Sequence, residues 1–508
     1  MGSKTVSVIV FAAVIAGAPT RVASADDGDL EDWGHEVVRM VDQALEELVE
    51  LLPSEYRPRL QRGRKTFRRL SWAVVRMGGT TYRVNVEPEQ TWDSYQKLKK
   101  AWTEEVTKIR SGRYRRPEAR DKVLGGNAAV AYREILERFA APKDRKLREA
   151  IASTEWVKSP GQPPPEPVRA WAREREDLAQ KLRQATSRAF VDWELQYEDG
   201  LEAGQTNLLE IRLLGTLLLV HARLREKEDP LEAARIILDT MRFGHDVSAH
   251  CTLVGGMMSL AVRQRAAQAL VSMVQGHVLD GQSLGAVRKE LRAIVDAAPS
   301  ARAALQTDRL LSEQQFHTMV SEPGDLPKSV PGVFRSKASR KKLKLFMAAF
   351  LLPSWVDYRE TCMEAERLCD RPFFEAARPL EFLSQRHEST DDLFLGMLMP
   401  SFSDLYEKWE EGTTRLRLLN ALLACEACRC ENGSLPKSWA DVAPFITAPE
   451  LIDPFVNARF VFKSGGDGIL IYSRGRDRDD DGGFDPRYDE DKRDRPEGDR
   501  GDLSYRLE

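Results

Sequence analysis

The chain has 508 residues, of which 31% are charged and 8% are aromatic, a composition typical of a folded globular protein. This length allows two or three domains with a substantial core. The formal net charge of −3 excludes a general attraction to nucleic acid or acidic lipid. We therefore expect no nucleic-acid partner.

Residues 1–25 have the pattern of a secretory signal peptide. Lys4 and the α-amino group make the start positive, residues 6–18 are apolar, and residues 23–25 are small, as at a cleavage site. The apolar run is too short to span a bilayer, and retention as an anchor is the alternative. No later stretch is apolar enough to span. The sequence predicts an exported protein, periplasmic or extracellular, without a transmembrane helix after signal removal.

Residues 26–122 predict a mainly helical N-terminal region. Apolar residues recur at helical spacing between residues 30 and 52, and again over residues 91–110. Residues 72–86 are compatible with a small hairpin about two glycines.

Residues 123–412 predict a helical-array domain. A helix is expected over residues 127–140, and the prolines of residues 159–167 predict an extended connector, because proline excludes the α region for its predecessor. Residues 208–225 and 230–250 predict an αα-hairpin that resembles one tetratricopeptide unit. No second copy occurs at that period, so we expect an irregular array. Further helices are predicted over residues 251–275 and 283–297.

Residues 413–508 predict a small α+β module. A helix ends at Asn432-Gly433, an Asp453-Pro454 turn follows, and a hairpin ends at Tyr472-Ser473 before an acidic, glycine-containing loop. The predicted fold class is therefore mainly α, an irregular helical array of αα-hairpins with this C-terminal α+β module.

The acidic loop is the best candidate site. Asp477, Asp479 and Asp481 alternate directly before two glycines, and calcium prefers carboxylate and carbonyl oxygens at alternating loop positions. An EF-hand is excluded, because its twelfth position is Tyr488 and no two helices flank the loop. The alternative is a solvated acidic tail, since acidic and basic residues crowd the last segment.

One catalytic pattern occurs. Gly281-Gln282-Ser283-Leu284-Gly285 matches the nucleophile elbow of serine hydrolases, which requires a strand, a strained turn and a helix. Helical patterns on both sides instead favour Ser283 as the N-cap of a helix that starts at Leu284. A hydrolase using Ser283 is kept as an alternative, and a non-catalytic protein is preferred.

Cys425, Cys428 and Cys430 share a helical pattern that has no second Cys/His pair at zinc spacing. This favours structural cysteines, either buried or paired.

Residues 335–352 join a basic stretch to an apolar one. A peripheral membrane-surface element is one interpretation. The preferred one is a solvated loop before a buried helix that ends at Pro353.

Residues 413–508 resemble the C-terminal region of the type II secretion major pseudopilin, the general secretion pathway protein G. The shared features are the ends and turns described above, Leu435-Pro436, Gly475 before the acidic loop, and a late aspartate. The resemblance implies calcium bound at Asp477, Asp481 and Asp502. The pilin N-terminal helix is absent, so assembly into a pseudopilus is not expected.

Residues 126–508 are also similar to a set of exported proteins best known from planctomycete bacteria. The shared residues are Asn127-Ala128-Ala129, Tyr132, the proline stretch, Arg169-Ala170-Trp171, residues 208–250 and Ser504-Tyr505-Arg506-Leu507. This resemblance implies location and architecture and leaves the reaction open. We expect a non-catalytic envelope protein that binds or scaffolds an envelope protein or peptide through its helical surface.

Overall fold

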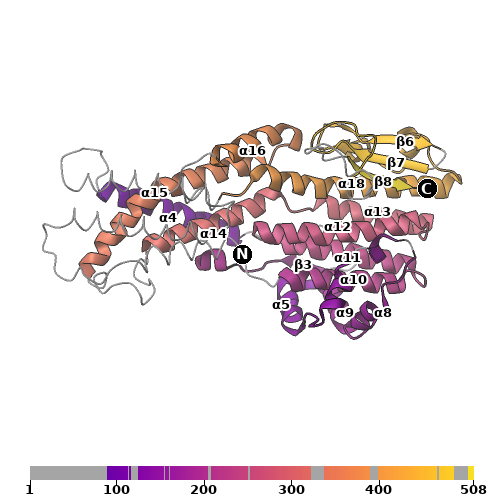
Figure 1. Cartoon of the computed structure of the whole chain (residues 1–508), viewed down its shortest axis with the longest axis horizontal. Helices are drawn as coiled ribbons and strands as arrows, with labels where there is room; N and C mark the ends of the chain where they lie inside the picture. Colours follow the sequence, from indigo (N-terminus) through magenta and orange to yellow (C-terminus); the bar gives the residue numbers. More distant parts are fainter. Residues whose placement is uncertain are drawn as a thin grey trace.

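The computed structural model describes residues 88–111, 114–115, 124–153, 155–159, 161–203, 208–249, 252–321, 337–388, 399–465, 468–485 and 502–507 (Figure 1). The predicted signal peptide, the helix between residues 30 and 52 and the hairpin at 72–86 lie outside these residues. The described part is mainly helical with a small sheet near its C-terminal end, as predicted. Among its helices, none combines the length and the apolar character needed to cross a membrane.

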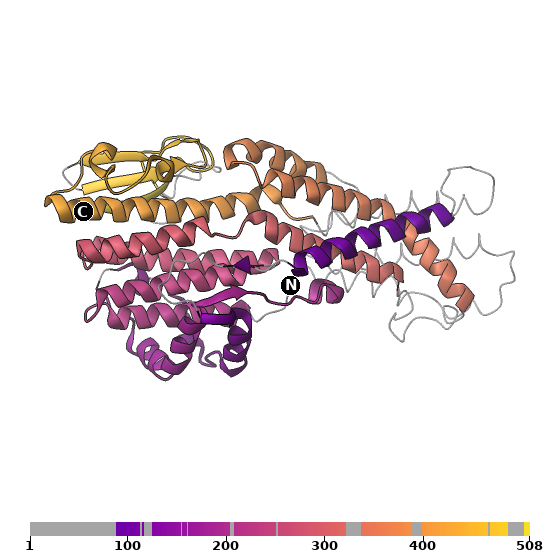
Figure 2. The ribbon, with the colours of Figure 1, turned by 180° about the vertical axis from the view of Figure 1, so that it is seen from behind.

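The molecule is elongated. Long helices run side by side in the body, an arm of α4, α14 and α15 extends at one end, and the C-terminal sheet lies at the other (Figures 1 and 2). One large hydrophobic cluster runs from the body to the sheet. The arm and the sheet are therefore joined through the same helical body.

The body is built on the predicted αα-hairpin, which is confirmed. α10 (Leu208–Arg225) and α11 (Pro230–Ser248) are joined at Asp229, whose carboxylate accepts the Glu232 N–H at 3.0 Å, with proline in the first helical turn. α12 (Leu253–Gln275) and α13 (Gly281–Asp296) follow as predicted. Gly215 of α10 lets α12 approach, because a Cβ there would lie 3.0 Å from Val262 Cγ1.

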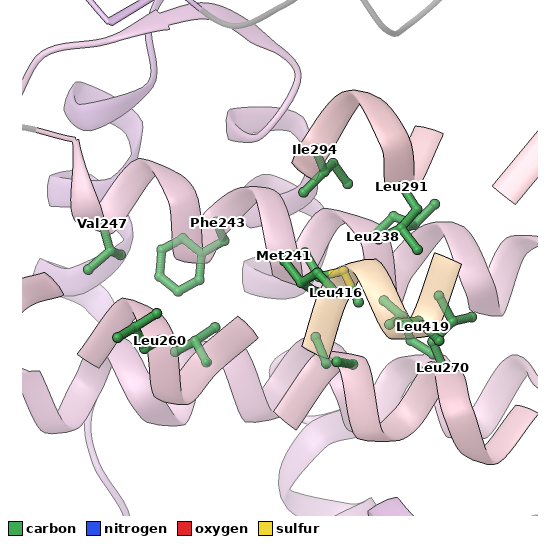
Figure 3. Packing of buried hydrophobic residues seen from close by; sticks show 14 of the residues in the cluster. Leu238, Met241, Phe243, Val247, Leu260, Leu270, Leu291, Ile294, Leu416 and Leu419 are labelled. Atoms are coloured by element: carbon green, nitrogen blue, oxygen red, sulfur yellow. The ribbon is translucent and has the colours of Figure 1, made fainter. Parts of the chain in front are cut away.

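The layer below α18 is largely apolar. Side chains of α11, α12 and α13 meet those of α18 (Phe402–Asn432) in Figure 3. They include Leu238, Met241, Leu270, Leu291, Leu416 and Leu419, all of them buried. The predicted boundary between residues 412 and 413 falls inside α18, which is continuous there.

A lobe of short helices lies against α10 and α12. It comprises α5 (Ala128–Arg138), α6 (Arg145–Ala152), α7 (Glu155–Lys158), α8 (Glu166–Arg173) and α9 (Glu176–Ala185). The connector turns at Gly161, where φ is 69°, and is extended only from residue 162 to Pro165, so the prediction of extended chain over residues 159–167 was wrong at both ends. Proline is tolerated in a first helical turn, which is where Pro167 lies.

A small sheet beside this lobe was not predicted. It has the order β1-β3-β2, formed by β1 (Tyr114–Arg115), β2 (Leu124–Asn127) and β3 (Arg188–Val191), and the short 3₁₀ helix η1 (Tyr197–Glu202) follows. β3 is antiparallel to β1 and parallel to β2. These strands are too short to show an alternating pattern in the sequence.

The arm contains α4 (Pro88–Ser111), α14 (Ala301–Ser321) and α15 (Lys337–Leu368), and α16 (Phe373–Glu388) leads back to α18. α15 runs through Pro353, so the prediction that this helix ends there was wrong. Trp355 and Tyr358, just beyond the proline, are each 1% exposed. Their burial favours continuing the helix despite the missing N–H donor.

The C-terminal sheet lies on α18. β6 (Val461–Gly465) and β7 (Gly468–Ser473) form the predicted hairpin, and β8 (Leu503–Leu507) pairs antiparallel with the other edge of β7. Before it come α19 (Trp439–Val442), η3 (Ala448–Leu451), β4 (Ile452–Asp453) and β5 (Ala458–Arg459). The acidic segment leaves β7 and returns as β8, so both its ends are fixed by the sheet.

Candidate functional site

The acidic loop begins at a turn that is tied to the rest of the module. The buried Asp453 accepts the backbone N–H groups of Phe455 at 3.0 Å and Arg474 at 3.1 Å, and Gly475 adopts a φ of 64°. The next side chain, Arg476, forms ion pairs with Asp404 and Glu407 of α18. The loop therefore leaves the sheet in a defined direction, against α18.

Asp502 lies at the other end of the loop and is fully buried, with 0% of its surface exposed. Its Oδ2 accepts the Gly483 N–H at 2.7 Å, and its own N–H donates to Phe484 O at 2.7 Å. Its Oδ1 is buried and accepts no hydrogen bond from the described residues. A buried carboxylate oxygen without a partner is costly, because it has lost its hydration.

The carboxylates around Asp502 disfavour its ionised form. Burial is the main cause that raises the pKa of Asp502 to about 7, and the charges of Asp481, Asp480 and Asp477 add to it. The hydrogen bond from Gly483 acts in the opposite direction. The loop thus gathers several like charges around one buried carboxyl group.

Only some of the aspartates predicted to bind calcium interact with the buried Asp502 carboxyl group. Asp477 and Asp481 are half-buried and act on Asp502, whereas Asp479 is exposed and contributes its N–H to Asp477 Oδ1 at 3.3 Å. Asp480, which the prediction omitted, accepts the Tyr472 hydroxyl at 2.7 Å and the Gly482 N–H at 3.0 Å.

The prediction omitted Asp480 because it assumed regular alternation along the loop. Two successive Asx turns form instead, from residue 477 to 479 and from 480 to 482, and they change the direction of the side chains. The neighbouring tyrosine of β7 was the available signal, since a buried phenol needs a hydrogen-bond partner.

All groups at this centre are oxygens, which suit calcium better than a transition metal. In the part of the chain that the structure describes, no three His, Cys, Asp or Glu side chains are already close enough to hold a metal ion. The observation that fits a cation is the buried Oδ1 of Asp502 together with the surrounding negative charge.

Ser283 lies in the first turn of α13. The Asp280 carboxylate accepts the Ser283 N–H at 2.7 Å, so the helix begins at Gly281 and Asp280 is its N-cap. The prediction that Ser283 caps a helix from Leu284 was wrong, since an aspartate three residues earlier takes that role. The segment before this turn is α12, and the elbow requires a strand there.

The five described cysteines are free. Cys425 and Cys428 are buried in α18 and Cys430 is exposed, in agreement with a structural role for the first two. Burial raises the pKa of Cys369 to about 12, which keeps that thiol protonated and unreactive.

The basic and apolar segment at residues 335–352 belongs largely to α15, whose backbone is helical from Lys337. The first two of its residues lie outside the described part, and the membrane-surface interpretation stays untested.

Comparisons with known protein families, with curated proteins and with solved structures found no match to this chain. The arguments below therefore rest on its own residues.

Proposed function

We propose that this chain is a non-catalytic, exported protein of the cell envelope that binds or scaffolds a protein or peptide partner through its helical body. A calcium ion fixes its C-terminal module on α18. The signal-like residues 1–25 support export. The elongated arrangement of helices lying side by side supports a binding role, because helical arrays offer long continuous surfaces (Figure 2).

The observation that carries the calcium proposal is the burial of Asp502 beside other carboxylates. A calcium ion would take Asp502 Oδ1 and oxygens of Asp477 and Asp481, with carbonyls or water completing its coordination. When bound, the ion supplies positive charge and holds the loop against the sheet. Its binding energy then adds to the stability of the folded module.

Thermal unfolding of the full chain tests this proposal. Millimolar calcium should raise the unfolding midpoint above that in chelator, with a gain of about 2.7 kcal/mol when calcium is a hundredfold above its Kd. Asp502→Asn should remove the calcium response. Asp479→Asn is the matched control, since Asp479 is exposed in the same loop, and it should keep most of the response. Equal wild-type midpoints in calcium and chelator would reject the calcium site.

The binding role needs a separate experiment. Tagged full-length protein, incubated with envelope extract, should retain a stoichiometric partner that the same protein does not retain after heat unfolding. Recovery of the same proteins on folded and unfolded chain would contradict the proposed role.

A further inference from the structure

A cavity of about 190 Å³ lies between α10 and α12, on the side that faces α6 and α7. Arg212 and Ala261 are exposed at this cavity, and Arg265 is buried within it. Residues from both helices line it, among them Arg212, Thr216, Leu219, Val262, Gln264 and Arg265. The cavity thus combines two arginines and three neutral polar side chains, those of Thr216, Gln264 and Gln268, with apolar walls.

Arg265 is 7% exposed and has only neutral partners in the described structure. Its Nη1 donates to Thr216 Oγ1 at 3.1 Å, and its Nη2 donates to the carbonyls of Ile151, at 2.8 Å, and Ser153. The ring of Trp156 lies 5.6 Å from its guanidinium carbon. Its buried Nε donates to no described residue.

Several other buried arginines of the described residues are paired with carboxylates. Arg309 contacts three glutamates, Arg223 contacts Glu226, and Arg415 contacts Asp485. A buried guanidinium without an opposite charge is unfavourable, because its lost hydration is not replaced. The charged neighbour of Arg265 is instead Arg212, across the same cavity.

We propose that this cavity binds a compact organic oxyanion, with its carboxylate or phosphate group between Arg212 and Arg265. A guanidinium matches the geometry of either group, and no carboxylate among the described partners of Arg265 competes for its charge. The space agrees with a small ligand, since an apolar cavity of about 150 Å³ can hold benzene. Burial, and then the charge of Arg212, lower the pKa of Arg265 to about 10. An anion bound beside the guanidinium would stabilise its charged form and so act against both effects. This site is independent of the calcium loop and of the proposed envelope role.

The test uses the full chain in phosphate, acetate, benzoate or chloride at equal ionic strength. We expect at least one oxyanion to raise the unfolding midpoint above chloride and to bind at 1:1 in calorimetry. Arg212→Gln should weaken that binding roughly ten- to hundredfold, the loss expected for one charge-assisted contact. Arg225→Gln is the control, because Arg225 is exposed on the same helix outside the lining.

A second variant blocks the cavity without removing charge. Ala261→Phe fills the exposed rim and should abolish the response while the protein stays folded in chloride. A response to phosphate alone assigns a phosphate ligand, and a response to acetate or benzoate alone assigns an organic acid. The proposal fails if no oxyanion exceeds chloride, or if Arg212→Gln and Ala261→Phe both bind as wild type.

Discussion

Arg309 and Glu313 form an ion pair one turn apart on α14, with an Nη1–Oε1 distance of 2.6 Å and with both side chains 0% exposed. Arg309 also contacts Glu366 of α15, at an Nε–Oε1 distance of 2.6 Å, and Glu105 of α4. Arg359 of α15 shares two of these glutamates. One buried guanidinium therefore connects the three helices of the arm.

Arg309→Met should destabilise the protein by about 3–5 kcal/mol, because it leaves buried carboxylates without their main counter-charge. Urea unfolding measures the loss. Arg302→Met is the control: Arg302 is 45% exposed and contacts an aspartate that is 49% exposed, so its loss should cost less than about 1 kcal/mol. Equal losses in the two variants would show that the arm does not depend on the buried pair.

Gly256→Ala should destabilise the body by about 1–3 kcal/mol, through overpacking. A Cβ at this position would lie 2.7 Å from Trp409 Cζ3, and the indole is held by a hydrogen bond from its Nε1 to Pro299 O at 2.9 Å. Gly285→Ala is the matched control on α13, where nothing lies within 4 Å. It should stabilise by up to about 1 kcal/mol, from helix propensity alone. A stability gain in Gly256→Ala would contradict the close contact.

The sequence was sufficient to predict those helices and strands whose ends are marked by local residue patterns. The α10–α11 hairpin was predicted to within two residues, because Asp229 and Pro230 mark a helix start and the apolar spacing is regular. The β1-β3-β2 sheet was missed, since its strands have two to four residues and the residues of β3 pair with residues 63 to 77 positions earlier. Pairing over such distances is decided by tertiary packing and leaves no local pattern.

The sites were less accessible to prediction than the helices. The carboxylates of the loop are visible in the sequence, but the burial of Asp502 depends on β8 pairing with β7, which aligns Tyr505 with Ile471. Asp502 was predicted only through the pseudopilin resemblance, which the comparisons leave untested. Arg265 has no local signal at all, because the lack of a carboxylate beside it is a property of the packed helices.

His317 predicts a loss of stability in mild acid. Burial lowers the pKa of His317 to about 4, and the Tyr95 hydroxyl lies against its Nδ1. At this side chain the unfolded chain binds more protons than the folded one between pH 4 and 6.5, so the contribution of His317 to stability falls as the pH drops through this window. His317→Gln should remove this contribution, so that lowering the pH from 7 to 4 costs the variant less stability than it costs wild type in unfolding midpoints measured in the same buffers. An unchanged slope in the variant would place the titration elsewhere.

Asp502 predicts the opposite dependence when calcium is removed. The pKa of Asp502 is raised to about 7, above the ordinary value of 3.8, so the folded state holds its proton more tightly than the unfolded state does. Stability from this group is present below pH 4 and is lost as the pH rises to 7. The pKa of Asp480 is lowered, mainly by the hydrogen bond from the Tyr472 hydroxyl, so its effect on stability falls below pH 4 and outside this window.

Unfolding in chelator at pH 4.5 and pH 8 isolates this group when wild type is compared with Asp502→Asn. Relative to wild type, the variant should gain on the order of 2 kcal/mol between the two pH values, because an amide needs no proton. Saturating calcium at pH 8 should reverse the order, since the ion stabilises the carboxylate and does so much less for the amide. If wild type and variant keep a constant difference in chelator from pH 4.5 to 8, Asp502 titrates as an ordinary solvated carboxyl group.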